Sequence, residues 1–193
     1  NDTGAEAAHS QAEVGVQWLA DHGDKIDART LCPNGRVFAL TQDKWEAALQ
    51  FRRAGLRDDK VHIVQDAALL AEAADNLGYP FWLRARHGAG ARGSALCTTW
   101  AEALNWARYW WARDRKYDFN AEEYLPGRDL AWTSLWHYGT LIASFGRERL
   151  EYIYPNLAPS GRTGTPTIPR TIHDQVLNEL AVRAVRAIDD HAH

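Results

Sequence analysis

Methionine is missing from all 193 residues, and the chain begins with Asn1. A natural reading frame begins with methionine, and at ordinary usage a chain of this length would contain about four more. We therefore expect that Asn1 is not the natural start and that these residues are part of a longer protein.

Other features are scarce, and each scarcity argues against a class of protein. The chain has 22 Lys and Arg against 25 Asp and Glu, a net charge of -3, which disfavours nonspecific nucleic-acid binding. It has no run of about 18 apolar residues and no apolar leader, so we expect neither a membrane span nor a signal segment. Cys32 and Cys97 fit no metal spacing and provide no disulfide framework. A cytoplasmic protein with no nucleic-acid or membrane partner is the simplest interpretation.

Apolar periodicity predicts helices and strands in a mixed order. Hydrophobic residues make up 46% of the chain, enough for one domain or two small lobes with a real core. The order is helix, strand, helix, strand, turn, strand and helix, followed by antiparallel strands and a last helix, which indicates a two-layer α+β fold. Expected helices cover about 11–22, 44–53, 66–76, 100–114 and 174–189; expected strands cover 61–64, 81–84, 94–98, 119–124, 130–137 and 140–154; residues 155–170 are expected to form a long loop.

A glycine-rich turn at residues 88–93 matches the pattern G-x-G-x-x-G. A dinucleotide-binding site would need a helix that starts at the third glycine, Gly93, whereas residues 94–98 read as a strand. The pattern instead favours a hairpin flap whose backbone N–H groups approach phosphate oxygens, with Arg84, Arg86 and Arg92 beside it. An ordinary surface hairpin is the alternative. The nucleotide-dependent oxidoreductase is a third function hypothesis, which a strand after Gly93 would exclude.

Several segments occur in an order that resembles the ATP-grasp family, especially its carbamoyl-phosphate-synthetase-like branch. The resemblance covers about residues 40–190 and implies an ATP-grasp-like α+β fold, truncated in this chain, with two lobes of mixed or antiparallel sheets gripping a nucleotide cleft. The implied division is a remnant of a preceding domain or a linker at 1–40, a first lobe with the flap at 41–118, and a second lobe, incomplete at its C-terminus, at 119–193. The matching segments are Asp43-Lys44, Gly78–Arg84, the flap at 88–94, Glu123-Tyr-Leu-Pro-Gly127 and Ser160-Gly-Arg-Thr-Gly164.

The resemblance also assigns roles to individual residues. Lys44 and Arg84 would contact the nucleotide phosphates, and the flap glycines Gly88, Gly90 and Gly93 would cover them. Glu123 would lie beside the adenine, the Leu125 backbone would face the adenine edge, and Asp129 would bind the ribose. Arg162, Thr163 and Gly164 would meet ATP or its acyl partner. The candidate catalytic residues are Arg84, Arg147, Arg149 and Arg162.

The chain departs from the family where the Mg²⁺ ligands are expected. The family places these acids on later strands, and residues 189–193 offer only Asp189, Asp190, His191 and His193. We therefore assign no metal ligand within the chain and expect the Mg²⁺ ligands outside it. His191 and His193 are read as tail residues.

The resemblance implies an ATP-dependent ligase that activates a small-molecule carboxylate as an acyl phosphate for attack by an amine or a similar nucleophile. The alternative is a catalytically silent module that binds a partner or regulates another subunit. Four tryptophans at residues 100–111 lie on one expected helix, and this pattern is typical of a core or a homodimer interface. The alternating charges of residues 147–151 indicate either a solvated face or arginines that hold a carboxylate.

Overall fold

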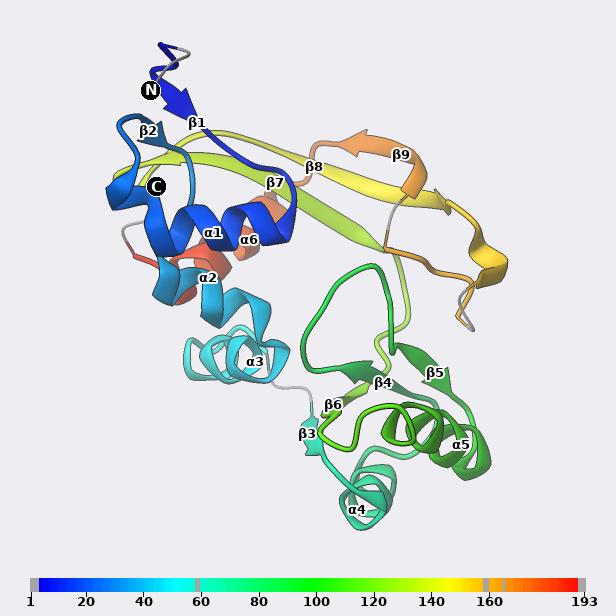
Figure 1. Ribbon diagram of the computed structural model, residues 1–193. Coiled ribbons are helices and arrows are strands. Elements are labelled where there is room, and N and C mark those ends of the chain that lie inside the picture. The colour runs from blue at the N-terminus through cyan, green and yellow to red at the C-terminus, as the bar shows by residue number, and fades with distance from the viewer. Residues whose placement is uncertain (1–3, 58–59, 158–159, 165, 191–193) are drawn as a thin grey trace.

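The computed structural model describes residues 4–57, 60–157, 160–164 and 166–190. Their helices and strands form two groups that lie one above the other in Figure 1. The lower group contains a four-stranded sheet with two helices, and the upper group contains a three-stranded sheet with the remaining helices. His191 and His193 lie outside the described residues.

The four-stranded sheet is antiparallel, in the order β3-β6-β4-β5. Two helices, α4 and α5, pack against it and against each other. The bounds of these four strands and two helices are β3 Val61–Val64, α4 Ala67–Leu77, β4 Phe81–Ala85, β5 Ala95–Cys97, α5 Trp100–Trp111 and β6 Phe119–Glu123.

Alternation along β4 separates the core from the opposite face of this sheet. Phe81 and Leu83 are fully buried and belong to the hydrophobic core, while Trp82 and Arg84 are only partly buried. Because successive side chains of a strand point to opposite faces, Trp82 and Arg84 share the face away from α4 and α5. That face borders the site described below.

The three-stranded sheet is also antiparallel, in the order β7-β8-β9, and helix α6 packs against β7 and β8. Gly146 of β8 allows the close approach, since a Cβ there would lie 3.1 Å from Leu177 Cδ2 of α6. The bounds are β7 Leu130–His137, β8 Thr140–Tyr152, η2 Pro155–Leu157, β9 Pro166–Ile172 and α6 Gln175–Ile188.

The N-terminal segment lies with the upper group, which contains the three-stranded sheet, rather than with the four-stranded sheet (Figure 1). Helix α2 packs against α1, α3 and α6, and α3 also packs against α6. The bounds are β1 Ala7–Ala8, α1 Glu13–His22, η1 Gly23–Lys25, β2 Arg29–Thr30, α2 Gly35–Gln42 and α3 Lys44–Arg53, with β1 and β2 forming a short parallel pair.

Most expected elements are confirmed, but three details differ. Strand β9 covers residues 166–172, although residues 155–170 were predicted to form a loop, and helix α2 was not predicted. Strand β6 pairs with β3 and β4, so the sheets change between Glu123 and Leu130 rather than at residue 119. The hairpin prediction is confirmed, because β4 and β5 pair antiparallel on either side of the glycine turn.

The tryptophans of α5 contribute to the core of their own sheet. Trp106, Trp110 and Trp111 pack against the core cluster, and Trp106 Nε1 donates a 3.2 Å hydrogen bond to the Gly93 carbonyl. Trp111 Nε1 donates to the Tyr117 carbonyl at 2.9 Å. The core reading is thus confirmed, and a homodimer through this helix stays a prediction. Within the described residues, no helix combines the length and apolarity that a bilayer crossing requires.

Candidate functional site

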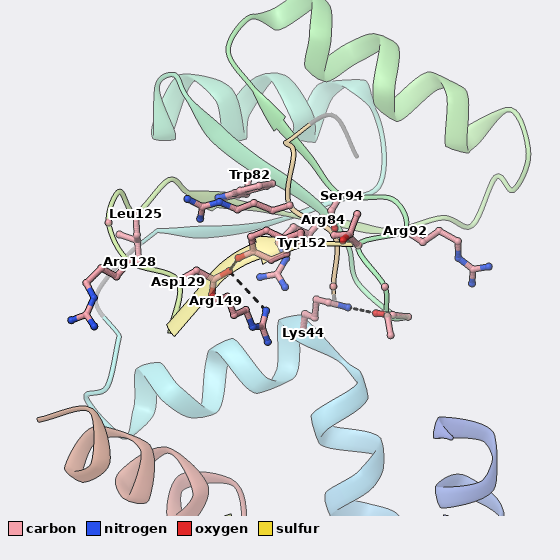
Figure 2. Close-up of a pocket in the computed structure, with 18 residues that line it drawn as sticks. Lys44, Trp82, Arg84, Arg92, Ser94, Leu125, Arg128, Asp129, Arg149 and Tyr152 are labelled. Carbon is pink, nitrogen blue, oxygen red and sulfur yellow. Dashed lines mark hydrogen bonds and ion pairs between the residues drawn. The ribbon is translucent and has the colours of Figure 1, made fainter. Parts of the chain in front are cut away.

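A cavity of about 440 Å³ lies where the glycine turn, helix α3 and the end of β8 meet (Figure 2). Its walls come from both groups of elements, so residues far apart in the sequence face one space. The lining residues are Lys44, Trp82, Arg84, Gly88, Ala89, Gly90, Ala91, Arg92, Ser94, Leu125, Gly127, Arg128, Asp129, Arg149, Tyr152, Arg162, Thr163 and Gly164.

Positive charge dominates this cavity. Six of the lining residues are basic, and Asp129 is the one lining residue with a carboxylate. Clustered cations within a concave surface raise the local concentration of anions, and they donate charge-assisted hydrogen bonds to phosphate or carboxylate oxygens. The cavity therefore fits a ligand with several negative charges. The basic residues are Lys44, Arg84, Arg92, Arg128, Arg149 and Arg162.

Lys44 is the first residue of α3, and its ammonium reaches the flap. Its Nζ donates a 2.7 Å hydrogen bond to the Gly88 carbonyl, and its backbone N–H donates to the Arg86 carbonyl at 3.1 Å. Burial, followed by the positive charge of Arg84, lowers the pKa of Lys44 below its ordinary value. An anion bound beside Lys44 would favour its charged form.

Asp43 and Arg86 form a clamp behind Lys44. Arg86 Nη2 donates to Asp43 Oδ2 at 2.6 Å and its Nε to Asp43 Oδ1 at 2.9 Å, while Asp43 also caps α3. Burial, the largest single influence, opposes ionisation of Asp43, but the hydrogen bonds from Arg86 and the Glu46 backbone together with the charges of Arg86 and His87 outweigh it, so the pKa of Asp43 falls below its ordinary value. Arg86 was expected to contact phosphate together with Arg84 and Arg92. It instead ties the base of the flap to the start of α3.

Arg84 lies on β4 beside a buried carboxylate. Arg84 Nη1 is 3.5 Å from Glu122 Oε2, and Arg57 Nη2 is 3.4 Å from the same oxygen. Glu122 is 7% exposed, whereas the predicted adenine-side acid, Glu123, is exposed, and neither carboxylate is among the lining residues. Register explains the difference, because Glu122 pairs with Trp82 on the cleft face of the sheet and Glu123 points the other way.

The flap glycines meet the loop that follows β8. Gly88 and Gly90 have φ angles of +96° and +68°, a backbone conformation that favours glycine. A Cβ on Gly164 would lie 3.0 Å from the Gly90 Cα, so the flap tip and this loop touch through two glycines. Gly93, in contrast, does not line the cavity: a Cβ there would meet the Tyr117 hydroxyl and would lie 2.9 Å from the Ala85 Cβ. Packing and a φ angle of +73°, rather than ligand contact, account for glycine at 93.

Asp129 and Tyr152 contact each other in the lining of the cavity. The Tyr152 hydroxyl donates a hydrogen bond to Asp129 Oδ2, and Arg149 Nη1 lies 3.9 Å from the same oxygen. The Arg149 backbone N–H also donates to the Asp129 carbonyl at 2.9 Å. Burial and the bond to Asp129 raise the pKa of Tyr152 to about 12. At neutral pH the phenol is therefore protonated and acts as the donor.

Glu148 anchors Arg128 at the rim of the cavity. Arg128 Nε donates to Glu148 Oε1 at 3.0 Å, and Arg170 Nη2 donates to Glu148 Oε2 at 2.5 Å. These two hydrogen bonds lower the pKa of Glu148 to about 2. Arg147, a predicted catalytic residue, does not line the cavity; its guanidinium lies 5.8 Å from the Phe145 ring centroid.

Sequence reasoning gave no site role to Trp82, Ser94, Arg128 or Tyr152, all of which line the cavity. Trp82 had a usable signal, because it lies two residues before Arg84 on the same strand and hence on the same face. Arg128 and Tyr152 had none, since their place depends on how the second sheet docks against the first.

The lining residues do not fit a magnesium ion. Within the described part of the chain, no group of three or more His, Cys, Asp or Glu side chains is arranged so that it could hold a metal ion. Asp129, the one lining carboxylate, is bonded to Tyr152 and lies near Arg149. Mg²⁺ prefers carboxylate and other oxygen ligands in octahedral geometry. We assign no step to a metal in this chain.

Comparison with known proteins identifies the fold through structure alone. No family model matches the chain, and no curated protein matches it in sequence. The biotin carboxylase domain of Hydrogenobacter thermophilus 2-oxoglutarate carboxylase, solved with MgADP and bicarbonate, superimposes with a TM-score of 0.74 at 20% identity. The alignment covers 97% of this chain and 43% of that one. The chain has the ATP-grasp fold.

Two further ATP-grasp structures agree. D-alanine–D-alanine ligase from Bacillus anthracis matches with a TM-score of 0.69 at 14% identity, covering 95% of this chain and 61% of its own. Carboxyaminoimidazole ribonucleotide synthase from Aspergillus clavatus, solved with ATP, matches with a TM-score of 0.68 at 19% identity, covering 94% and 46%. The chain thus spans about half the length of these ATP-grasp proteins. Strand β5 after Gly93 excludes the oxidoreductase hypothesis, and the carbamoyl-phosphate-synthetase-like branch stays a prediction.

Proposed function

We propose that this ATP-grasp chain binds ATP in the cationic cavity and forms the nucleotide-gripping part of an ATP-dependent ligase. The observation that carries the proposal is the convergence of six basic side chains and the glycine flap on one space between the two sheets. A triphosphate carries the charge that such a space requires. The structural neighbours, which include two ligases or synthases and a carboxylase domain, support this choice.

Each part of the cavity has a task in this proposal. Lys44 and Arg84 neutralise the phosphates, and the backbone N–H groups of the flap at Gly88 and Gly90 approach them without a Cβ in the way. Trp82 and Leu125 provide the apolar wall for the base. Arg149 and Arg162 contact the acidic partner of ATP.

The proposed reaction has two steps. A carboxylate oxygen of the substrate attacks the γ-phosphorus, the bond to the β,γ-bridging oxygen breaks, and ADP leaves. An amine nitrogen then attacks the acyl carbon, and phosphate leaves as the amine loses a proton. Arg149 and Arg162 would stabilise the charge of the transferred phosphoryl group, because preorganised cations in an enclosed site strengthen such contacts.

Calorimetric titration of the chain with ATP, ADP and AMP tests nucleotide binding. We expect affinity to fall as phosphates are removed, since Lys44, Arg84 and the flap are assigned to them. Equal affinity for ATP and AMP would contradict the assignment of this end of the cavity.

The acyl-phosphate step needs a separate experiment. The chain is incubated with ATP and either ¹⁸O-labelled bicarbonate, which is bound in one neighbour, or ¹⁸O-labelled D-alanine, which the name of another neighbour contains. We expect ADP release that depends on the carboxylate, with ¹⁸O recovered in inorganic phosphate. ADP release without ¹⁸O in the phosphate would contradict an acyl phosphate.

A second candidate is nucleotide binding without group transfer, in a module that binds a partner or regulates another subunit. It is favoured by the engagement of Asp129, the one lining carboxylate, with Tyr152. Under this hypothesis the calorimetric titration detects ATP, but no probe acid stimulates ADP release.

A further inference from the structure

The bond between Tyr152 and Asp129 lies in the middle of the cavity. In Figure 2, Leu125 and Arg128 lie toward one end, Lys44, Ser94 and Arg92 lie toward the other, and Asp129 and Tyr152 lie between them. Leu125 and Trp82 are the large apolar residues of the lining, while Lys44 and the flap form the phosphate end. A nucleotide has its sugar between its base and its phosphates. The Asp129–Tyr152 pair therefore lies beside the position expected for the sugar.

The chemistry of Asp129 agrees with this placement. An ionised carboxylate only accepts hydrogen bonds, and it repels phosphate oxygens. The ligand group that faces Asp129 must then be a neutral donor, such as a sugar hydroxyl. The Tyr152 hydroxyl already supplies a donor of this kind to Asp129 Oδ2, and Arg149 adds a positive charge 3.9 Å from that oxygen.

We propose that Tyr152 is a specificity-determining residue for the sugar of the nucleotide. Its hydroxyl occupies Asp129 Oδ2, the oxygen that we assign to the ribose, so the cavity gains little from the ribose 2′-hydroxyl and binds ribo- and 2′-deoxyribonucleoside triphosphates about equally. This inference rests on the proposed nucleotide binding. It adds a residue and a selectivity that the ligase proposal does not contain.

The test compares the dissociation constants of ATP and 2′-deoxy-ATP by calorimetry. For the wild-type chain we expect the two constants to agree within about twofold. In Tyr152→Phe, Asp129 loses its internal donor and accepts from the ribose, so we expect a preference for ATP of about tenfold, as for a hydrogen bond to a charged group. Tyr154→Phe is the matched control, because it makes the same change at an exposed residue outside the lining and leaves the ratio unchanged.

Asp129→Asn provides a second check that does not require the Tyr152 variant to fold. With Tyr152 in place, the ratio of the ATP and 2′-deoxy-ATP dissociation constants in Asp129→Asn stays within about twofold. In the double variant Tyr152→Phe/Asp129→Asn, the ATP preference gained by the single Tyr152 variant disappears.

The possible results are distinguishable. A tenfold ATP preference in the wild type, or the same ratio in wild type and Tyr152→Phe, overturns the role of Tyr152 and leaves nucleotide binding intact. Absence of binding by either nucleotide to any of these proteins overturns the proposed function and this inference together. A ratio that changes only in Tyr152→Phe supports the inference.

Discussion

Apolar and polar side chains alternate in both sheets of this chain, but the apolar side chains are buried to very different extents. In the four-stranded sheet, Phe119 and Leu83 are fully buried between the strands and two helices. In the three-stranded sheet, Phe145 is 48% exposed, and helix α6 has no buried residue. Alternation alone therefore does not decide burial; a covering layer does. The cavity lies between a well-packed half and a half with a largely open sheet.

Polar contacts hold much of the group around the three-stranded sheet together. Asn178 of α6 accepts hydrogen bonds from Trp132 Nε1 and Ser144 Oγ, both at 2.9 Å, which ties the helix to β7 and β8. Glu148 joins Arg128 to Arg170 across the same sheet. Such half-exposed contacts contribute less to stability than apolar burial, since water competes for them. We expect the free energy of unfolding to depend mainly on the four-stranded sheet.

The largest effect is expected from a truncation in the packed half. Phe119→Ala removes a fully buried ring and leaves a cavity, so we expect it to lower the free energy of unfolding by about 4 kcal/mol. Urea unfolding followed by circular dichroism measures the loss. Phe145→Ala is the matched control in the open half, where the loss stays below about 1 kcal/mol. Equal losses in the two variants would contradict the comparison.

Loss of a helix cap is expected to have a smaller effect on stability, and the effect should differ between α4 of the packed half and α6 of the open half. Asp66 accepts from the N–H groups of Ala68 and Leu69 at the start of α4, and Asp174 accepts from Leu177 at the start of α6. Replacing either by Ala costs about 1 kcal/mol, while Asn retains the cap. We expect Asp66→Ala to lower global stability and Asp174→Ala mainly to speed hydrogen exchange within α6. Slower or unchanged exchange in α6 would count against a loosely held helix.

The smallest effect concerns pH. The pKa of Glu148 is about 2 in the folded chain and 4.5 ordinarily, so its contribution to stability is present above pH 4.5 and is lost as the pH falls toward 2. Melting temperatures between pH 6 and pH 2 should fall less steeply in Glu148→Gln than in the wild type. Identical slopes would show that the bonds to Arg128 and Arg170 do not depend on the charge of Glu148.

Local patterns predicted most of the fold, and the misses have physical causes. Pro166 and Pro169 made residues 155–170 read as a loop, yet β9 is the edge strand of its sheet, where a residue without an N–H donor is tolerated. Helix α2 has Gly35 as its first residue, and the only capping signal is Asn34, which accepts from the Val37 N–H. Such a short helix depends on its packing against α1, α3 and α6.

Residues of the cavity lining could be predicted where they lie within one short sequence motif. Lys44, Arg84, Gly88, Gly90, Asp129 and the 162–164 loop all line the cavity, while their roles toward a nucleotide stay predictions. Glu123 and Gly93 do not, because strand register turns Glu123 away and the Tyr117 ring packs against Gly93. Tyr152 was not predictable, since its meeting with Asp129 depends on the approach of two strand ends separated by a β-hairpin.

The central claim is that the cavity between the two sheets binds polyphosphate through Lys44 and Arg84. Titration of Lys44→Ala and Arg84→Ala with ATP tests it most directly, beside the exposed controls Lys116→Ala and Arg115→Ala, with circular dichroism confirming that each variant is folded. The account predicts that each cavity variant weakens ATP binding by about tenfold or more while the controls bind as the wild type does. Unchanged ATP affinity in both cavity variants would contradict it.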